Sequence, residues 1–269
     1  MATNKSMTNE MPGNAVDVNS YLTIHTIDPN DLKEVLAKGL EDFKEKPSHI
    51  ILLVIIYPII GLFLASFTAG ENLWQLIFPI MSGFALIGPL AAIGLYEISR
   101  RRELGLDASW KHAVNVIHSP SIFAILKLSV LLGVIYFAWL GTAQLIFLAT
   151  LGDAAPPSIA AFMGLIVTTP EGWVLIFFGC AAGFVFAVIV LATSAVSFPM
   201  LLDRNVSMST AVQTSVKVFL ANPKTMFLWG GIVVVLLVAG SLPFFIGLAV
   251  AMPVLGHATW HLYRKTVAE

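Results

Sequence analysis

The stretch KTMFLWGGIVVVLLVAGSLPFFIGLAVAMPVLGHATWHLYR, residues 224–264, decides the fold because no charged residue lies between Lys224 and Arg264. A single helix over this length would measure about 60 Å, which is about twice the hydrocarbon core of a bilayer. Gly240-Ser241-Leu242-Pro243 lies near its middle and supplies residues that end a helix and form a turn. The stretch therefore predicts two membrane-crossing helices in a tight hairpin, near 225–241 and 243–262.

Four further apolar stretches precede this hairpin, and each is long enough for a helix to cross a bilayer. We predict crossings near 50–68, 73–98, 122–150 and 173–200. The composition agrees, because 57% of the residues are hydrophobic and 12% are charged, against about 25% charged in an ordinary soluble domain. The predicted fold is all-α, a polytopic membrane helix bundle with six transmembrane helices that contact the lipid bilayer.

The 15 Lys and Arg residues collect at one end of the predicted crossings. Lys127 lies at the membrane edge, near the start of the third crossing, and the others lie in the leading segment, in alternate loops and in the tail, whereas the opposite loops hold Glu71, Asp153 and Glu171 and no cation. Loops rich in Lys and Arg stay on the cytoplasmic side of a membrane. We therefore predict a bacterial inner (plasma) membrane protein with both termini in the cytoplasm. Its first crossing is expected to be an uncleaved anchor.

Three short segments on the cytoplasmic side combine an apolar helical face with a polar one, near 29–46, 108–119 and 208–221. Each is followed by a proline just ahead of a crossing, which disfavours continued helical geometry in the residue before it. We predict three amphipathic helices there. Residues 1–27 are polar and lack this periodicity, and they predict a disordered cytoplasmic tail.

Helices and crossings together predict a threefold internal repeat within the membrane domain, residues 28–269. Each unit is an amphipathic helix, a proline, an outward crossing and a returning crossing, so the six crossings form three pseudo-repeated hairpins. Pro89 and Arg100 in the second crossing have the same spacing as Pro253 and Arg264 in the sixth. The alternative is that helix–proline–helix similarity arises by chance in any polytopic protein.

His257 and His261 are the candidates for a metal or haem site. Their i, i+4 spacing puts both on one helix face, as a pair of ligands requires. The alternative is that they make structural polar contacts, because His261 lies near Arg264 at the headgroup level. His49 and His118 are further polar candidates near the same interface.

Glu97 is another polar candidate, and it corresponds to His261 in the predicted repeat. This suggests a contact between the two side chains. Alternatively, Glu97 pairs with Arg100 or Arg101 one turn away.

Several function classes lack their sequence signals. No Asp, Glu, Lys or Arg lies deep within a predicted crossing, although ion-coupled carriers usually keep such a group. A phosphate-binding glycine loop, a nucleophile elbow and paired catalytic carboxylates are also missing, so we expect neither an enzyme with catalytic residues nor a bound cofactor. A nucleic-acid partner is not expected either, because no basic stripe is interleaved with aromatics.

The single cysteine, Cys180, excludes an internal disulfide. It lies in an apolar run, and we expect it to be a small buried hydrophobic residue.

Four stretches of the sequence resemble a bacterial integral-membrane family catalogued as domain of unknown function 2189. They are GLEDFKEKPSH (39–49), GFALIGPLAAIGLYEISRRRELG (83–105), SFPMLLDR (197–204) and PVLGHATWHLYR (253–264). The resemblance covers roughly residues 28–265. It implies a multi-pass inner-membrane protein, without an activity or a site residue to carry over.

Three functions stay open on the sequence alone. The leading hypothesis is a non-enzymatic accessory or scaffold component, which contacts other membrane subunits or forms a homo-oligomer. The first alternative is a permease or channel for a small neutral or amphipathic solute. The second is a haem- or metal-binding membrane protein that uses His257 and His261.

Overall fold

The structure is a computed structural model that describes residues 22–45, 73–154, 156–242 and 245–268, with three single residues between 45 and 73. Its described elements are helices, apart from two short strands, so the all-α class is confirmed. Nearly all of the predicted crossing near 50–68 lies outside the described residues, as do His49 and Pro243.

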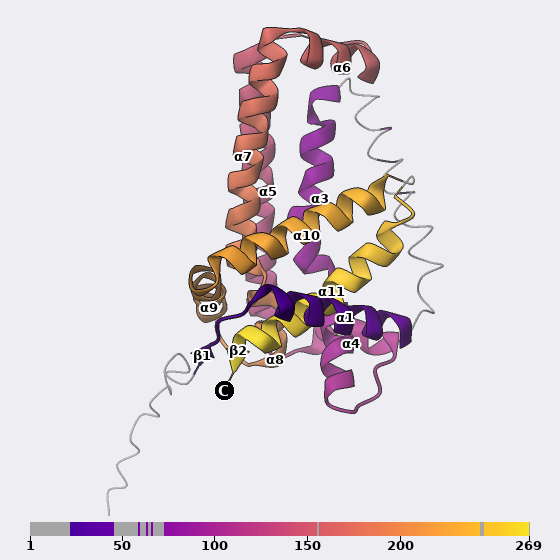
Figure 1. Cartoon of the computed structure of the whole chain (residues 1–269), viewed down its shortest axis with the longest axis vertical. Coiled ribbons are helices and arrows are strands. Elements are labelled where there is room, and N and C mark those ends of the chain that lie inside the picture. The colour runs from indigo at the N-terminus through magenta and orange to yellow at the C-terminus, as the bar shows by residue number, and fades with distance from the viewer. Residues whose placement is uncertain are drawn as a thin grey trace, which may run out of the picture.

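Three of the described helical segments are long and apolar enough to cross a membrane. They are α5 (Ile122–Leu151), α7 (Pro170–Ser194) together with α8 (Ser197–Asp203), and α10 (Pro223–Ser241). Helices α5 and α7 run side by side (Figure 1). Only 6% of the most apolar window in the segment of α7 and α8 is buried, and an apolar surface left unburied in this way is one that lipid can solvate.

Cys180 lies on this exposed surface of α7, so the expectation of a buried residue is wrong. An apolar run indicates burial only where water is the solvent. In a membrane protein the same run can face lipid instead.

The segment predicted as a crossing near 73–98 is divided into several helices. It contains η3 (Trp74–Leu76), α3 (Ile77–Ala91) and α4 (Ile93–Glu103), with a turn at Ala92. The 15 residues of α3 cover about 22 Å, less than the roughly 30 Å of a hydrocarbon core. That this segment crosses the membrane therefore stays a prediction.

Helix α11 (Leu248–Thr266) overlaps the predicted crossing near 243–262 and extends beyond it. It ends in charged residues and is not among the three membrane-length segments. Helix α6 (Ile159–Thr168) is apolar and lies between two predicted crossings, in a region predicted to be a loop. Its 10 residues are too few to cross a bilayer.

Helices lie at all three positions where amphipathic helices were predicted. They are α1 (Pro29–Glu45), η4 (Trp110–His118) and α9 (Met208–Ala221), and η4 is a 3₁₀ helix. Asp28 begins α1 by accepting hydrogen bonds from the amides of Asn30 at 2.7 Å and Asp31 at 3.1 Å, which satisfies N–H groups that have no partner within the helix.

The helical core is concentrated at the end of the molecule where α1, α4, α8, α9 and α11 meet (Figure 1). In α8, Phe198, Met200 and Leu201 are completely buried. Long side chains from several helices therefore fill this end of the described chain.

The two chain ends meet in a small sheet, where β1 (Thr23–Ile24) pairs antiparallel with β2 (Val267–Ala268). The described residues thus include 22–27, the last six residues of the segment predicted as a tail. A two-residue strand carries no measurable periodicity, so the sequence offers no signal for it.

Asn222 connects this segment to the junction of α9 and α10, and its replacement tests that connection. Its buried side chain accepts a hydrogen bond from the amide of Ile27 at 2.8 Å. It also donates one to the carbonyl oxygen of His25 at 3.0 Å. Asn222→Ala leaves these groups without partners, and we expect a loss of about 1–3 kcal/mol of stability. The melting temperature in detergent should fall. Asn205→Ala, at an exposed position, should change the melting temperature little. Equal changes in melting temperature for the two variants would contradict the structural role of Asn222.

Candidate functional site

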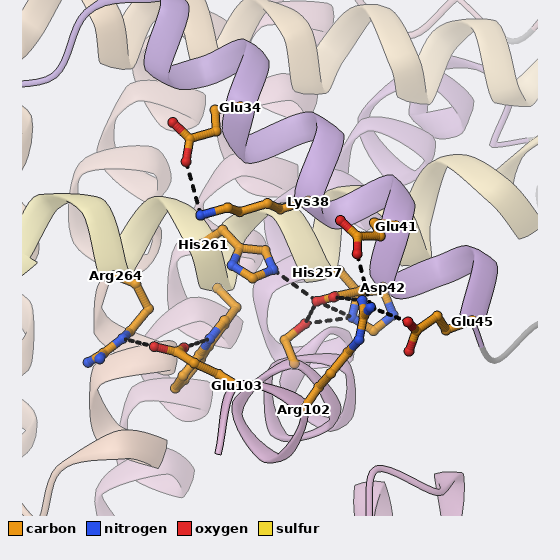
Figure 2. Close-up of polar contacts among 12 residues, drawn as sticks. Glu34, Lys38, Glu41, Asp42, Glu45, Arg102, Glu103, His257, His261 and Arg264 are labelled. Atoms are coloured by element: carbon orange, nitrogen blue, oxygen red, sulfur yellow. Dashed lines mark hydrogen bonds and ion pairs between the residues drawn. The ribbon is translucent and has the colours of Figure 1, made fainter. Parts of the chain in front are cut away.

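Helices α1, α4 and α11 meet around the carboxylate of Asp42 (Figure 2). The approach is close because Gly39, one turn earlier in α1, has no side chain. A Cβ atom at Gly39 would lie 2.7 Å from the Cβ of Ala258 and 2.7 Å from the carbonyl oxygen of Val254. The backbones of α1 and α11 are therefore in contact, and Asp42 is 5% exposed.

Three side chains from the other two helices donate hydrogen bonds to Asp42. Its Oδ2 accepts from Ser99 Oγ at 2.5 Å and from His261 Nε2 at 2.9 Å. Its Oδ1 accepts from Arg102 Nη1. A buried carboxylate is tolerated when it is paired and hydrogen-bonded in this way. We call these five side chains, Asp42, Ser99, Arg102, His257 and His261, the Asp42 cluster.

Further ion pairs hold α1 along its length. Arg102 also contacts Glu41 at 3.2 Å, and it contacts Glu45. At the other end of α1, Lys265 of α11 lies 2.6 Å from both Asp31 and Glu34. The hydrogen bonds to these two carboxylates raise the pKa of Lys265. Because these outer pairs are partly exposed, each contributes little to stability compared with the buried contacts of Asp42.

Ser99, His257 and Asp42 are the residue types of a hydrolase triad, but their arrangement differs from one. In a triad the imidazole lies between the hydroxyl and the carboxylate. Here the hydroxyl is in the middle, because His257 Nδ1 is 2.8 Å from Ser99 Oγ and 3.9 Å from Asp42 Oδ2. The hydroxyl hydrogen is directed to Asp42, and Ser99 is 1% exposed. The cluster is therefore suited to holding three helices together and not to nucleophilic attack.

The charge of Asp42 depends on a balance of opposing effects. Burial raises the pKa of its carboxyl group, but hydrogen bonds from His261 and Ser99 outweigh burial and lower the pKa below its ordinary value. Because the folded state favours the ionised form, the carboxylate stabilises the fold at every pH above its ordinary pKa. This stabilisation is lost as the pH falls through the lowered value.

This balance predicts a pH dependence that is specific to Asp42. We expect the melting temperature of the native protein to exceed that of Asp42→Asn at about pH 6, and the difference to shrink towards about pH 3. Other carboxylates also titrate in this range, and comparing the two proteins removes their shared contribution. A difference that stays constant over the whole range would contradict the lowered pKa.

A cavity of about 370 Å³ opens beside the cluster between α1, α4 and α11. Charged side chains line most of it, and they are already engaged with one another. Lys38 is 2.9 Å from Glu34, and Arg264 is 3.0 Å from Glu103, which also accepts from Trp260 Nε1. The cavity is thus a cleft between ion-paired helices, and its lining does not match an apolar or neutral solute.

The structure brings together two of the residues selected from the sequence, since His257 and His261 both join the Asp42 cluster. In the described part of the chain, no group of three or more His, Cys, Asp or Glu side chains is arranged to hold a metal ion. His118 lies apart from them and is exposed at the end of η4.

Glu97 pairs with Arg100 at 2.8 Å and with Arg101 at 3.6 Å. Glu97 therefore makes the alternative, local ion pairs and not the suggested contact with His261. His261 instead contacts Asp42, which comes from a helix far away in the sequence.

Asp42, the acceptor that joins the cluster, was not among the residues predicted from the sequence. A signal was present, because Leu32, Val35, Gly39 and Asp42 are buried at helical spacing on one face of α1. A carboxylate on the apolar face of an amphipathic helix indicates a buried polar partner.

Comparison with known proteins identifies a family and no individual relative. No match was found among curated proteins or among solved structures. A family model described as predicted integral membrane protein (DUF2189) matches residues 77–203, from the start of α3 to the end of α8. Two of the four stretches quoted for the resemblance, 83–105 and nearly all of 197–204, lie in this range. The resemblance is thereby confirmed for residues 77–203, which match this family of predicted integral membrane proteins of unknown function.

Proposed function

We propose that the protein is a non-enzymatic accessory or scaffold component of a membrane complex in the bacterial inner membrane. The observation that supports this most directly is the state of its buried polar groups. Ser99, Asp42 and His257 are the side chains best suited to chemistry, and they are closed off in contacts between helices. A protein built to catalyse or to carry ions would leave such groups open to a substrate.

The proposed orientation has both termini in the cytoplasm. In Figure 1, α1, α4, α8 and α9 gather at one end of α5 and α7, and α6 lies at the other end. The first end carries most of the described Lys and Arg residues, whereas Asp153 and Glu171 lie towards the second. The positive-inside rule assigns the basic end to the cytoplasm.

The proposed threefold repeat with six crossings is supported by how the short helices pack. Helix η4 packs on α4, which ends the second predicted crossing, and α9 packs on α8, which ends the fourth. Helix α1 packs on α11, which ends the sixth. Each short helix thus lies against the end of the preceding returning crossing, and α1 closes the cycle. A chance similarity between hairpins does not require this regular pattern.

Purification of the full chain in mild detergent, followed by native mass spectrometry, tests the proposed role. We expect species above the 29.0 kDa of one chain, with a second subunit or a second copy at a fixed ratio. The same preparation is reconstituted into proteoliposomes for a flux assay with small neutral solutes. A monomeric protein that conducts a solute would contradict the proposal and support a permease.

A further inference from the structure

Helices α9 and α10 meet in a corner at Asn222, at the basic end of the molecule (Figure 1). Two lysines flank this corner, Lys217 on α9 and Lys224 in the first turn of α10, and both side chains are exposed. Among the described residues, neither lysine has an ion-pair or hydrogen-bond partner for its side chain. The corner thus presents two positive charges that the fold itself does not use.

In the described part of the chain, no carboxylate neutralises these two charges. After Asp203 the sequence holds no Asp or Glu until its last residue, and Asp203 is engaged with Tyr263 and Arg264. Asp28 lies close in space, because its neighbour Ile27 is hydrogen-bonded to the corner. Its carboxylate, however, accepts backbone amides at the start of α1. An anion from outside the described chain can therefore pair with the two lysines.

The exposed stripe of α10 that begins at Lys224 is otherwise apolar. It continues at helical spacing through exposed side chains, namely Phe227, Leu228, Val234, Val235 and Val238. Helix α10 is long and apolar enough to cross a membrane, so this stripe is a surface that acyl chains can cover. Lys224 stands at the end of the stripe, where a lysine can keep its ammonium group at the level of the lipid headgroups.

Three aromatic rings join the corner to the exposed surface of α7. Phe227 of α10 stacks on Phe184 of α7 with ring centroids 6.1 Å apart, and it meets Phe219 of α9 edge-on with centroids 5.3 Å apart. Phe184 and Phe227 nevertheless stay 61% and 43% exposed. The cations of the corner thus adjoin an apolar surface made by two membrane-length segments. A molecule that matches both parts has an anionic head and an apolar chain.

We propose that the corner of α9 and α10 binds an anionic phospholipid, with the headgroup at Lys217 and Lys224 and an acyl chain against Phe184 and Phe227. Anionic lipids attract lysines that lie at the membrane surface. A zwitterionic lipid matches the corner less well, because its own cation would face the two lysines. A soluble anion would leave the exposed rings uncovered. This inference goes beyond the accessory role and does not depend on it.

The test uses the full chain in detergent, with native mass spectrometry as the readout. Mixed micelles supply either phosphatidylglycerol or phosphatidylcholine with the same acyl chains. We expect the native protein to retain phosphatidylglycerol in preference to phosphatidylcholine. Added salt should weaken that preference, because ions screen exposed charges. Equal retention of the two lipids would overturn the proposal, since an apolar surface alone would then explain the binding.

Paired substitutions locate the site. Lys217→Gln together with Lys224→Gln should weaken the tightest phosphatidylglycerol-binding step by about 30-fold, which corresponds to about 1 kcal/mol for each lysine. Lys217→Arg together with Lys224→Arg keeps both charges and should retain binding. Lys33→Gln together with Lys44→Gln removes two exposed charges from α1, where carboxylates are interspersed with them, and should bind as the native protein does. The proposal is also overturned if the two Gln pairs weaken binding equally, or if neither pair weakens it.

Discussion

Asp42→Asn is expected to destabilise the protein more than any other conservative substitution at the basic end. The amide removes the negative charge that Arg102 faces, and it leaves Ser99 and His261 competing for one oxygen. Removing one partner of a buried ion pair costs about 3–5 kcal/mol. The melting temperature of the purified protein should therefore fall by many degrees, and α1 should separate from α4 and α11 before the remaining helices unfold.

Glu45→Gln is the matched control, because Glu45 contacts the same Arg102 from the same helix but lies in solvent. Exposed ion pairs contribute about 0–1 kcal/mol. We therefore expect Glu45→Gln to lower the melting temperature only slightly. If the melting temperature fell equally in the two variants, burial of Asp42 would not contribute to stability.

Gly39→Ala should push α1 away from α11. The added Cβ would lie 2.7 Å from backbone and side-chain atoms of Ala258, and backbone atoms cannot move aside as the end of a flexible side chain can. Overpacking at such a contact costs about 1–3 kcal/mol. Hydrogen exchange in the peptides that cover α1 should become faster, while exchange in α5 and α7 stays unchanged.

Gly133→Ala provides the comparison, because a Cβ atom at Gly133 in α5 would meet nothing within 4 Å. Alanine is a better helix former than glycine by about 1 kcal/mol, so this variant should be neutral or slightly stabilised. If Gly39→Ala behaved in the same way, the close contact between α1 and α11 would be wrong.

Most helices could be predicted from the sequence, but not every break between them could. Apolar runs, helical periodicity and flanking prolines indicate α5, α9 and α10 to within about two residues. The turn at Ala92, between α3 and α4, follows Gly88-Pro89, but the long apolar run around it favours one continuous crossing. Helix α6 was missed for a related reason, since a short apolar segment next to long crossings does not show whether it is a helix or a loop.

Two of the five side chains in the Asp42 cluster could be predicted in the same way. Local spacing places His257 and His261 on one face of α11, because the helical period decides it. Their acceptor, Asp42, lies 219 positions from His261, and only tertiary packing brings it there. The ion pairs of Glu97, by contrast, could be predicted from the sequence. Its partners Arg100 and Arg101 lie about one helical turn away, so local spacing alone predicts them.

The central claim is that the Asp42 cluster and its basic surroundings lie at the cytoplasmic end of a membrane-embedded bundle. Labelling of single cysteines tests it most directly, in a Cys180→Ala background that carries either Asp153→Cys or Ser207→Cys. A membrane-impermeant maleimide applied to intact cells should label position 153, and it should label position 207 only after the cells are opened. Labelling of position 207 and not 153 in intact cells would contradict the account.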